Sequence, residues 1–410
     1  MAAVASLTAY DLAVSSPAVR RARASRVPRR INGVPVYEQE FWTSKQRQAN
    51  PLHEISYRGC FKPQLPAYFI DRLSKPGDVI YDPFSGRGTT AIEAALLGRN
   101  VIVNDINPLS TILTRPRLEA PLIANIDVRL RAIRLNAKRR NDIDLSMFYH
   151  PDTERELLNL RAYLIEKRLN GTEDECDRWI RMVATNRLTG HSSGFFSTYT
   201  LPPNQAVSPE SQIRINEKTG KEPEYRDVRA LILRKSMQLQ SDINAAARWR
   251  LQQAAARAQF HERPAAGTQA ISDDSVQLTV TSPPFLNVVQ YAKDNWLRCW
   301  FNGLDAEAVG SGITMSTTVE DWSDAMLAVL QEIHRITRPR GWVAFEVGEV
   351  QRGAVKLEEA VVPLGIEAGF SCEAILINTQ KFTKTSNIWG IGNNALGTNS
   401  NRIVMLQKPA

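Results

Sequence analysis

The segment of residues 75–108, KPGDVIYDPFSGRGTTAIEAALLGRNVIVNDINP, constrains the fold more than any other part of the chain. Residues 79–81 form a short apolar run of the kind found in buried strands, and residues 101–103 form a second one. Between them, residues 89–97 have the apolar periodicity of an amphipathic helix, and Gly98 stands where a helix ends. This order of strand, glycine-rich turn, helix and strand predicts a βαβ unit with two parallel strands.

Four later apolar runs continue the sheet that this unit predicts. They cover residues 277–281, 342–347, 372–377 and 402–407. Helical periodicity around residues 321–336 and 356–368 separates them, an alternation typical of doubly wound α/β folds. A long stretch rich in Asn, Gly, Ser and Thr joins the last two runs, which we expect to pair antiparallel.

Residues 115–268 show no comparable strand pattern and predict a mainly helical domain inserted into this sheet. Helical stretches lie near residues 122–140, 153–169, 172–187 and 226–258. Residues 187–225 are too long and too polar for an ordinary connection within a compact domain. The expected organisation is a basic flexible arm (1–35), the first part of an α/β domain (36–114), the insert (115–268) and the second part of the α/β domain (269–410).

Positive charge is concentrated in the arm and the insert of this chain, whose net charge is +8. Residues 1–30 hold six Arg against one acidic residue, Asp11, and residues 115–270 hold 26 Lys or Arg against 19 Asp or Glu. Residues 271–410 are acidic on balance. This asymmetry suits a polyanionic partner bound by the arm and the insert. A solvated tail and an organelle transit peptide are the alternatives for the arm.

Composition excludes several broad classes of protein. With 410 residues, 43% of them hydrophobic, the chain can bury a large core, which excludes a disordered or fibrous protein. It has no apolar run of the roughly 18 to 20 residues that a membrane span needs, and no secretory signal. The four cysteines and five histidines are scattered without ligand spacing. We therefore expect a soluble intracellular protein with no disulfide scaffold and no metal site.

The sequence DPFSGRGTT follows the first strand and opens the helix, which is where a glycine turn can bind a nucleotide. Gly86 and Gly88 permit positive φ and close approach of the backbone. Thr89 and Thr90 lie where a helix N-terminus offers free N–H groups. Asp105 ends the second strand, where an acidic residue can accept both hydroxyls of a ribose. The alternative is a purely structural turn followed by a surface Asp.

A second candidate constellation, TSPPF, stands at the end of the apolar run at residues 277–281. Pro283 and Pro284 remove two amide donors and stiffen the backbone, so that nearby carbonyls can point into a cleft. Ser282 adds a small donor and acceptor, and Phe285 adds a flat apolar face. Together these groups suit a planar base that carries an exocyclic amine. The alternative is a strand exit stiffened by proline.

The two motifs together resemble those of the amino-group DNA methyltransferases, which carry an FxGxG turn for S-adenosylmethionine and a [DNS]-P-P-[YF] catalytic motif. Phe84, Gly86 and Gly88 match the first motif, and residues 282–285 match the second. The resemblance covers roughly residues 57–110 and 270–410, about half of the chain. Two departures leave the subclass open: the second motif ends in Phe instead of the commoner Tyr, and a long insert separates a leading cofactor motif from the catalytic motif.

This resemblance implies a Rossmann-like class I methyltransferase sheet, mostly parallel with an antiparallel C-terminal strand, whose first part binds S-adenosylmethionine and whose second part is catalytic. The cofactor-binding residues that it implies are Phe61, Lys62, Pro63, Asp82, Phe84, Gly86, Gly88, Thr89, Thr90, Asp105 and Asp273. Residues 61–63 match the segment that closes over the methionine end of the cofactor, and Asp273 matches the acid that meets the adenine amine. For Asp273, an ordinary loop acid is the alternative.

The resemblance also implies site-specific methyl transfer to the exocyclic amine of a base flipped out of double-stranded DNA. Ser282 and the carbonyl of Pro283 hold the amine, while Pro284 and Phe285 complete the pocket for the base. The short, uncharged Ser282 favours N4 of cytosine, whereas the motif order points toward N6 of adenine, which is the alternative. A cognate restriction nuclease is a candidate partner, and a bacterial-type cytoplasm is the expected location.

The insert offers two groups of residues for contact with DNA. Arg129, Arg131, Arg134, Lys138, Arg139 and Arg140 can follow phosphates, and Phe195, Phe196 and Tyr199 can stack on bases. For any single Arg, a solvated helix face is the alternative. Three other functions stay open: an RNA amino-group methyltransferase, a non-catalytic nucleic-acid binder, and an NAD-dependent oxidoreductase, which gives no account of TSPPF.

Overall fold

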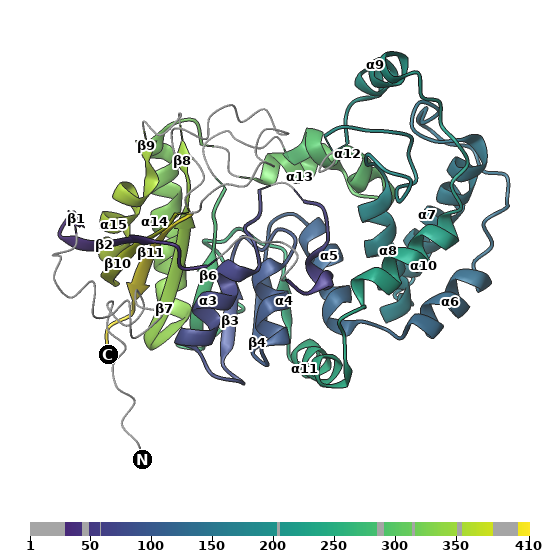
Figure 1. Cartoon of the computed structure of the whole chain (residues 1–410). Coiled ribbons are helices and arrows are strands. Elements are labelled where there is room, and N and C mark those ends of the chain that lie inside the picture. The colour runs from purple at the N-terminus through teal and green to yellow at the C-terminus, as the bar shows by residue number, and fades with distance from the viewer. Residues whose placement is uncertain are drawn as a thin grey trace.

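The computed structural model of the chain describes residues 29–42, 49–57, 59–202, 206–284, 291–313, 316–350, 355–379 and 401–410 (Figure 1). A nine-stranded sheet forms one side of the described molecule, and a group of helices forms the other. Across the sheet the strands are β1 (Arg29–Ile31), β2 (Val34–Gln39), β10 (Ser371–Asn378), β11 (Asn401–Gln407), β7 (Thr337–Val347), β6 (Val276–Thr281), β3 (Val79–Asp82), β4 (Asn100–Asn104) and β5 (Gln259–His261).

The strand pairing is that of a doubly wound sheet with an antiparallel C-terminal strand. β7, β6, β3, β4 and β5 pair in parallel, and β11 lies antiparallel between β7 and β10. The predicted Rossmann-like α/β fold, its βαβ unit and its antiparallel last strand are therefore confirmed. A separate two-stranded sheet pairs β8 (Glu349–Val350) with β9 (Val355–Lys356).

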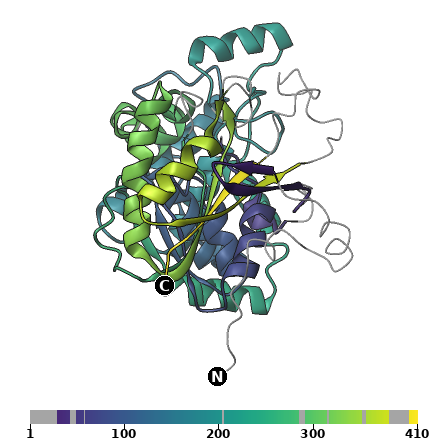
Figure 2. The same ribbon diagram turned by 90° about the vertical axis from the view of Figure 1, so that its left-hand side faces the viewer.

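Helices cover both faces of the sheet because apolar side chains alternate along its strands. On one face, Ile80 of β3 packs in a core with α3 (Gln64–Leu73) and α4 (Thr89–Leu96). On the other face, Tyr81 packs in a second core with α14 (Val319–Ile336) and α15 (Leu357–Glu367). Figure 2 shows the sheet between the green helices α14 and α15 and the purple N-terminal helices.

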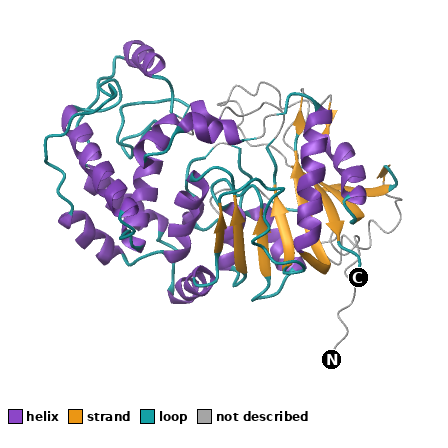
Figure 3. Cartoon of the chain, turned by 180° about the vertical axis from the view of Figure 1, so that it is seen from behind, coloured by secondary structure: helices purple, strands orange, loops and turns teal. Residues whose placement is uncertain are grey.

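The helical side of the molecule extends the first of these two cores. It contains α5 (Leu109–Glu119), α6 (Ile123–Ala132), α7 (Pro151–Leu169), α8 (Glu175–Arg187), α9 (Pro209–Thr219), α10 (Val228–Leu239), α11 (Ala245–Ala255), α12 (Tyr291–Asn302) and α13 (Ala306–Gly312). The short 3-10 helix η2 (Pro51–His53) lies at its border with the sheet. Trp179 of α8 and Phe148 belong to the same apolar cluster as Leu278 of β6. Figure 3 shows these helices, in purple, beside the orange strands.

Three expectations for the N-terminal arm and the insert need correction. Residues 29–31 of the predicted arm pair with β2, which extends the sheet, and residues 1–28 lie outside the described residues. The helix expected at 122–140 ends at Ala132, and the stretch at 226–258 divides into α10 and α11 because Asn244 caps a new helix. The polar segment 187–225 contains α9, whose ends are marked by Ser208, Pro209 and Gly220. The domain boundaries themselves stay a prediction.

No helix among the described residues is both long and apolar enough to cross a membrane. The same residues bring together no group of three or more His, Cys, Asp or Glu side chains that could hold a metal ion.

Candidate cofactor and catalytic site

The two sequence motifs meet where neighbouring parallel strands end. β3 and β6 pair in parallel, with Ile80 opposite Leu278, so their carboxyl ends lie at the same edge of the sheet. There the Thr281 hydroxyl donates a hydrogen bond of 2.7 Å to the Asp82 carboxylate. Asp82 and Thr281 are the first residues of the two motifs and are separated by 199 positions in the sequence, yet they are in direct contact.

Asp82 is buried and acts as the link between the motifs. Its carboxylate accepts the Thr281 hydroxyl and the Phe84 amide, the latter at 3.2 Å. Burial raises the pKa of Asp82 to about 7, and these hydrogen bonds oppose the rise only in part. The carboxylate is turned inward, toward the protein. A direct contact of Asp82 with a cofactor stays a prediction.

The glycine turn has the conformation that its sequence predicts. Gly86 has φ of +52° and Gly88 has φ of +75°, and Gly88 is the N-cap of α4. Asp105, which follows β4, accepts the Gly86 amide at 2.7 Å with one oxygen and the Asn107 amide at 2.9 Å with the other. Burial raises the pKa of Asp105 to about 6, although both backbone hydrogen bonds lower it. The acid is thus held against the glycine turn.

The hydroxyls of Thr89 and Thr90 are used inside the protein. Both side chains are buried. The Arg87 guanidinium donates to the Thr89 hydroxyl at 3.1 Å, and the Thr90 hydroxyl donates to the carbonyl of Val280 at 3.1 Å. What remains for a ligand is the backbone at this helix N-terminus, where the first amides have no acceptor in the helix itself.

Arg87 is a site residue that the sequence analysis missed. Its guanidinium lies in the protein and donates to the carbonyls of Ile55 at 2.8 Å, His53 at 3.2 Å and Phe61 at 3.4 Å. It thereby ties residues 53–61 to the glycine turn. The available signal was the position of Arg87 between two glycines of the motif, but nothing in the sequence names its carbonyl partners.

The segment of Phe61, Lys62 and Pro63 therefore reaches the turn, while a role of these residues in cofactor binding stays a prediction. Phe61 and Lys62 are half-buried, and Pro63 is buried at the start of α3. Burial, followed by the nearby charge of Arg87, lowers the pKa of Lys62. Tyr57 packs against the glycine turn at the same place. A Cβ atom on Gly86 would lie 3.4 Å from a ring carbon of Tyr57.

In the candidate catalytic motif, the serine is hydrogen-bonded to the carboxylate of Glu346. Ser282 is partly exposed, and its hydroxyl donates a hydrogen bond to Glu346, a buried residue of β7. The Asn401 side-chain amide donates to the same carboxylate at 3.0 Å. Burial raises the pKa of Glu346, and both hydrogen bonds oppose that rise. Sequence reasoning missed Glu346 because nothing in the motif points to β7.

One of the two prolines of the motif is held by a hydrogen bond to its carbonyl. Pro283 is buried, and the carbonyl of Pro284 accepts a hydrogen bond of 3.0 Å from the Trp322 indole N–H. This bond fixes the chain directly after the strand. Phe285, the fourth motif residue, lies outside the described residues.

Asp273 is not part of this site, which corrects the prediction made from the resemblance. It precedes β6 and so lies at the amino end of that strand, opposite the edge where the motifs meet. Its side chain is 71% exposed and forms an ion pair with Arg335. At the correct edge stands Glu262, directly after β5, whose negative charge raises the pKa of Asp105. The sequence hides it because β5 is only three residues long.

The six basic candidates of the insert do not share one environment, because two of them form ion pairs with acidic residues. Arg129 pairs with Asp174 at 2.6 Å and with the fully buried Asp177, and it is therefore a structural cation instead of a free phosphate contact. Arg131 pairs with Asp127 at 2.9 Å. The remaining candidates are exposed and lie beyond the end of α6 in an irregular segment: Arg134, Lys138, Arg139 and Arg140.

The aromatic candidates of the insert also need correction. Phe195 is 6% exposed and Phe196 is fully buried, so neither ring is available to stack on a base. The Arg187 guanidinium lies 4.0 Å from the centre of the Phe195 ring, which helps to hold it inside. Tyr199 alone of the three remains partly exposed.

Comparison with known proteins finds relatives for the part of the chain that contains the glycine turn. A family model described as DNA methylase (N6_N4_Mtase) matches residues 20–110. The chain is 38% identical over 77 residues to the type II methyltransferase M.MjaII of Methanocaldococcus jannaschii, a match covering 18% of the chain and 14% of that protein. It is 45% identical over 65 residues to the type II methyltransferase M.BsoBI of Geobacillus stearothermophilus, covering 15% and 13%. These matches span only a small part of both relatives.

Among solved structures, the rRNA methyltransferase aviRa of Streptomyces viridochromogenes aligns with 90% of the chain and 96% of its own length, at 13% identity and a TM-score of 0.37. The fold class is carried by the strand order of the sheet and not by this alignment. The family match covers the glycine turn, and the catalytic motif lies beside that turn at the same sheet edge. Residues 20–110 of the chain are thus similar to the amino-group DNA methyltransferases.

Proposed function

We propose that the protein transfers a methyl group from S-adenosylmethionine to the exocyclic amine of a base flipped out of double-stranded DNA. The observation that carries this proposal is the hydrogen bond between Thr281 and Asp82, which joins the glycine turn to the serine-proline motif at one sheet edge. A nucleotide-type cofactor at the turn and an amine at Ser282 are then neighbours.

The residues around the turn fit S-adenosylmethionine, the cofactor of this family. The amides at the start of α4 and the Asp105 carboxylate offer donors and acceptors to its polar groups. The buried Ser85 hydroxyl has no hydrogen-bond partner among the described residues, which leaves a polar atom in the turn for a ligand. When bound, S-adenosylmethionine supplies an electrophilic methyl group.

The role that we assign to the serine-proline motif is to orient the target amine. The Glu346 carboxylate accepts the Ser282 hydroxyl, which leaves the lone pairs of the serine oxygen free to accept an N–H of the target amine. The carbonyl of Pro283 is the second acceptor that we assign to the amine, because the carbonyl of Pro284 is already bonded to Trp322. Two acceptors fix the nitrogen lone pair in one direction, and positioning of this kind supplies much of the rate.

Within this proposal we favour N4 of cytosine as the acceptor. Ser282 is shorter than the Asp or Asn found at this place in other members, and its shortness suits a pyrimidine held close to the main chain. N6 of adenine is the second candidate, because the long insert between the motifs is more common among adenine enzymes. A cognate restriction nuclease and a cytoplasmic location remain predictions.

Incubation of the purified protein with tritiated S-adenosylmethionine and either duplex DNA or RNA tests the proposal. We expect label in DNA only, and mass spectrometry of the digested nucleosides should show N4-methylcytosine. N6-methyladenine would leave methyl transfer to DNA intact and overturn the choice of base. Label in RNA alone, or in neither, would overturn the proposed function.

Asp105→Ala should weaken the binding of S-adenosylmethionine by about 1 to 3 kcal/mol, the range for losing a charged hydrogen-bonding group. The variant removes a candidate ribose acceptor and also the acceptor of the Gly86 and Asn107 amides. Isothermal titration calorimetry measures the change. Asp273→Ala is the matched control, since Asp273 lies at the other end of its strand, and its affinity should equal that of the parent. Equal affinity in both variants would exclude Asp105 from the cofactor site.

Glu346→Gln should change the pH dependence of methyl transfer. Burial raises the pKa of Glu346, and only its carboxylate form accepts from Ser282 as strongly, so the parent rate should fall as pH falls through that raised pKa. The glutamine side chain cannot titrate, so the variant should lose the contribution of Glu346 to this acid limb, keep that of Asp82, whose pKa is about 7, and turn over more slowly at pH 8. Glu359→Gln, at an exposed position of α15, serves as control. An unchanged acid limb in Glu346→Gln would exclude the role of Glu346.

A further inference from the structure

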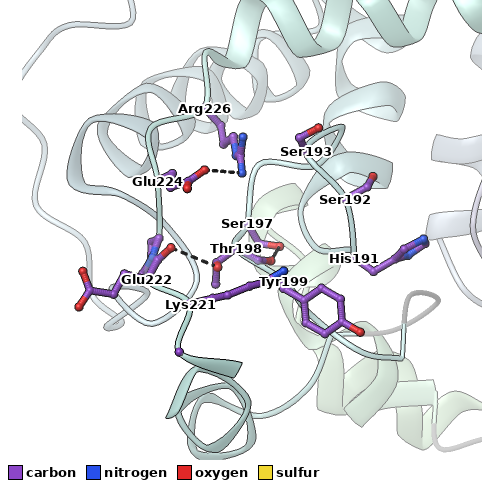
Figure 4. A pocket seen from close by; sticks show the side chains of 12 residues that line it. His191, Ser192, Ser193, Ser197, Thr198, Tyr199, Lys221, Glu222, Glu224 and Arg226 are labelled. Carbon is purple, nitrogen blue, oxygen red and sulfur yellow. Dashed lines mark hydrogen bonds and ion pairs between the residues drawn. The ribbon is translucent and has the colours of Figure 1, made fainter. Parts of the chain in front are cut away.

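A polar cavity of about 540 Å³ lies in the helical side of the molecule, between the loop that follows α8 and the turn that follows α9 (Figure 4). Residues 191–199 form one wall and residues 220–226 form the other. This volume is in the range of cavities that bind small molecules or parts of larger ones. No part of the catalytic machinery described above lines it.

The loop wall, residues 191–199, is fixed to the rest of the protein by hydrogen bonds of buried groups. The Phe196 amide donates to the carbonyl of Arg187 at 2.9 Å, and the Thr200 amide donates to the carbonyl of Gly190 at 2.9 Å. The fully buried Gln212 of α9 donates to the carbonyl of Tyr199 at 3.0 Å. These hydrogen bonds tie the buried part of the loop to α8 and α9.

The polar groups that face the cavity are mainly donors. Ser192, Ser193 and Tyr199, which carry hydroxyl groups, line the loop wall. From the other wall, the Lys221 ammonium extends to within 4.6 Å of the centre of the Tyr199 ring and has no carboxylate partner among the described residues. Arg226, which also lines this wall, pairs with Glu224 at 2.9 Å.

The acids of the cavity do not cancel this donor character. Glu224 is already paired with Arg226. Glu222 uses its carbonyl to accept the Thr198 hydroxyl at 3.4 Å, and Figure 4 shows its carboxylate pointing away from the opposite wall. A cavity with hydroxyl donors and an unpaired ammonium matches a ligand that is anionic and has only acceptors. A phosphodiester is such a group.

The loop is also connected to the catalytic motif. The chain that leaves it packs on α12, where the Ala206 amide donates to the carbonyl of Asp294 at 3.1 Å. The Trp296 indole of the same helix donates to the carbonyl of Val207 at 3.1 Å. α12 begins at Tyr291, soon after Pro284. In Figure 1, α9 and α13 both lie at the upper side of the molecule.

We infer that this cavity binds a backbone phosphate of the substrate DNA, with Lys221, Arg226 and the hydroxyls of Ser192, Ser193 and Tyr199 as its ligands. The inference rests on the proposed function and names where DNA is held. Arg129, an expected phosphate contact, is already paired with Asp174. The phosphate contact is assigned to the cavity wall of residues 220–226 instead.

Lys221→Ala tests the inference, measured by fluorescence anisotropy with a labelled duplex of random sequence at several salt concentrations. Loss of one phosphate contact should lower the slope of log affinity against log salt by about 0.9. Lys218→Ala is the matched control, because Lys218 is exposed on the last turn of α9 and does not line the cavity. Its slope should equal that of the parent. Ser193→Trp, which places a bulky ring at an exposed edge of the cavity, should weaken DNA binding without changing the affinity for S-adenosylmethionine.

The outcomes separate this inference from the proposed function. If the parent methylates DNA and Lys221→Ala keeps its salt slope, the cavity is not a phosphate site, while the proposed function stands. The same conclusion follows if Lys218→Ala lowers the slope equally, because the effect is then one of general charge. If the parent neither binds nor methylates DNA, the proposed function is wrong and the cavity loses its assigned ligand.

Discussion

Ser282→Ala should lower the rate of methyl transfer by about a hundredfold or more, the range for losing one oriented group that acts on the reacting atoms. The affinity for S-adenosylmethionine should stay unchanged, because Ser282 follows β6 and the glycine turn follows β3. In the parent, Glu346 holds the Ser282 hydroxyl, and the serine oxygen accepts the target amine. The variant leaves the buried Glu346 carboxylate without one donor and the amine without one acceptor. Single-turnover measurements with radiolabelled cofactor isolate the chemical step.

Ser275→Ala is the matched control for this change. Ser275 precedes the same strand at its other end, and its hydroxyl donates to the carbonyl of Ser272 at 2.6 Å. The control should methylate at the parental rate, since this serine is remote from the sheet edge that carries the motifs. Parental turnover in Ser282→Ala would show that the carbonyl of Pro283 and the surrounding pocket orient the amine without the serine.

The parts of the fold that could be predicted are those in which the signal is local. The glycine turn, α4 and β4 follow one another within residues 82–104, so periodicity and turn chemistry identify them together. The end of β6 at Thr281 is likewise visible, because two prolines follow the apolar run within three residues. Parallel pairing then brings both motifs to one edge without any knowledge of their contacts.

What could not be predicted depends on contacts between distant residues. Phe195 and Phe196 look like stacking residues in a polar loop, and only the packing of that loop against α8 shows that they are buried. Arg129 looks like a phosphate contact until Asp174 and Asp177, at the start of α8, are placed beside it. Asp273 was assigned by resemblance, and its ion pair with Arg335 belongs to the opposite sheet edge. Glu346 had no signal at all, since it reaches Ser282 only through the pairing of β6 with β7.

Gly88→Ala should destabilise the protein by about 2 to 5 kcal/mol, the sum of a left-handed conformation forced on alanine and overpacking of a buried contact. Gly88 has φ of +75°, and a methyl group there would begin 2.2 Å from the hydroxyl oxygen and 2.5 Å from the methyl carbon of Thr114 on α5. Thr114 is fully buried, so its side chain cannot move away into solvent. The glycine therefore serves the packing of the turn against α5 as well as the approach of a cofactor.

Two further variants separate the conformational part of this loss from the steric part. Gly171→Ala places a methyl group at φ of +65° with nothing within 4 Å, so it should lose only about 1 to 2 kcal/mol. Thr114→Ala in the Gly88→Ala background removes the two closest atoms and should recover part of the loss, because the residues are coupled through one contact. Urea unfolding of the four proteins, parent included, measures these differences. If Gly88→Ala lost no more than Gly171→Ala, or if Thr114→Ala recovered nothing, the turn would not be packed against α5 as described, and the only constraint on Gly88 would be its backbone conformation.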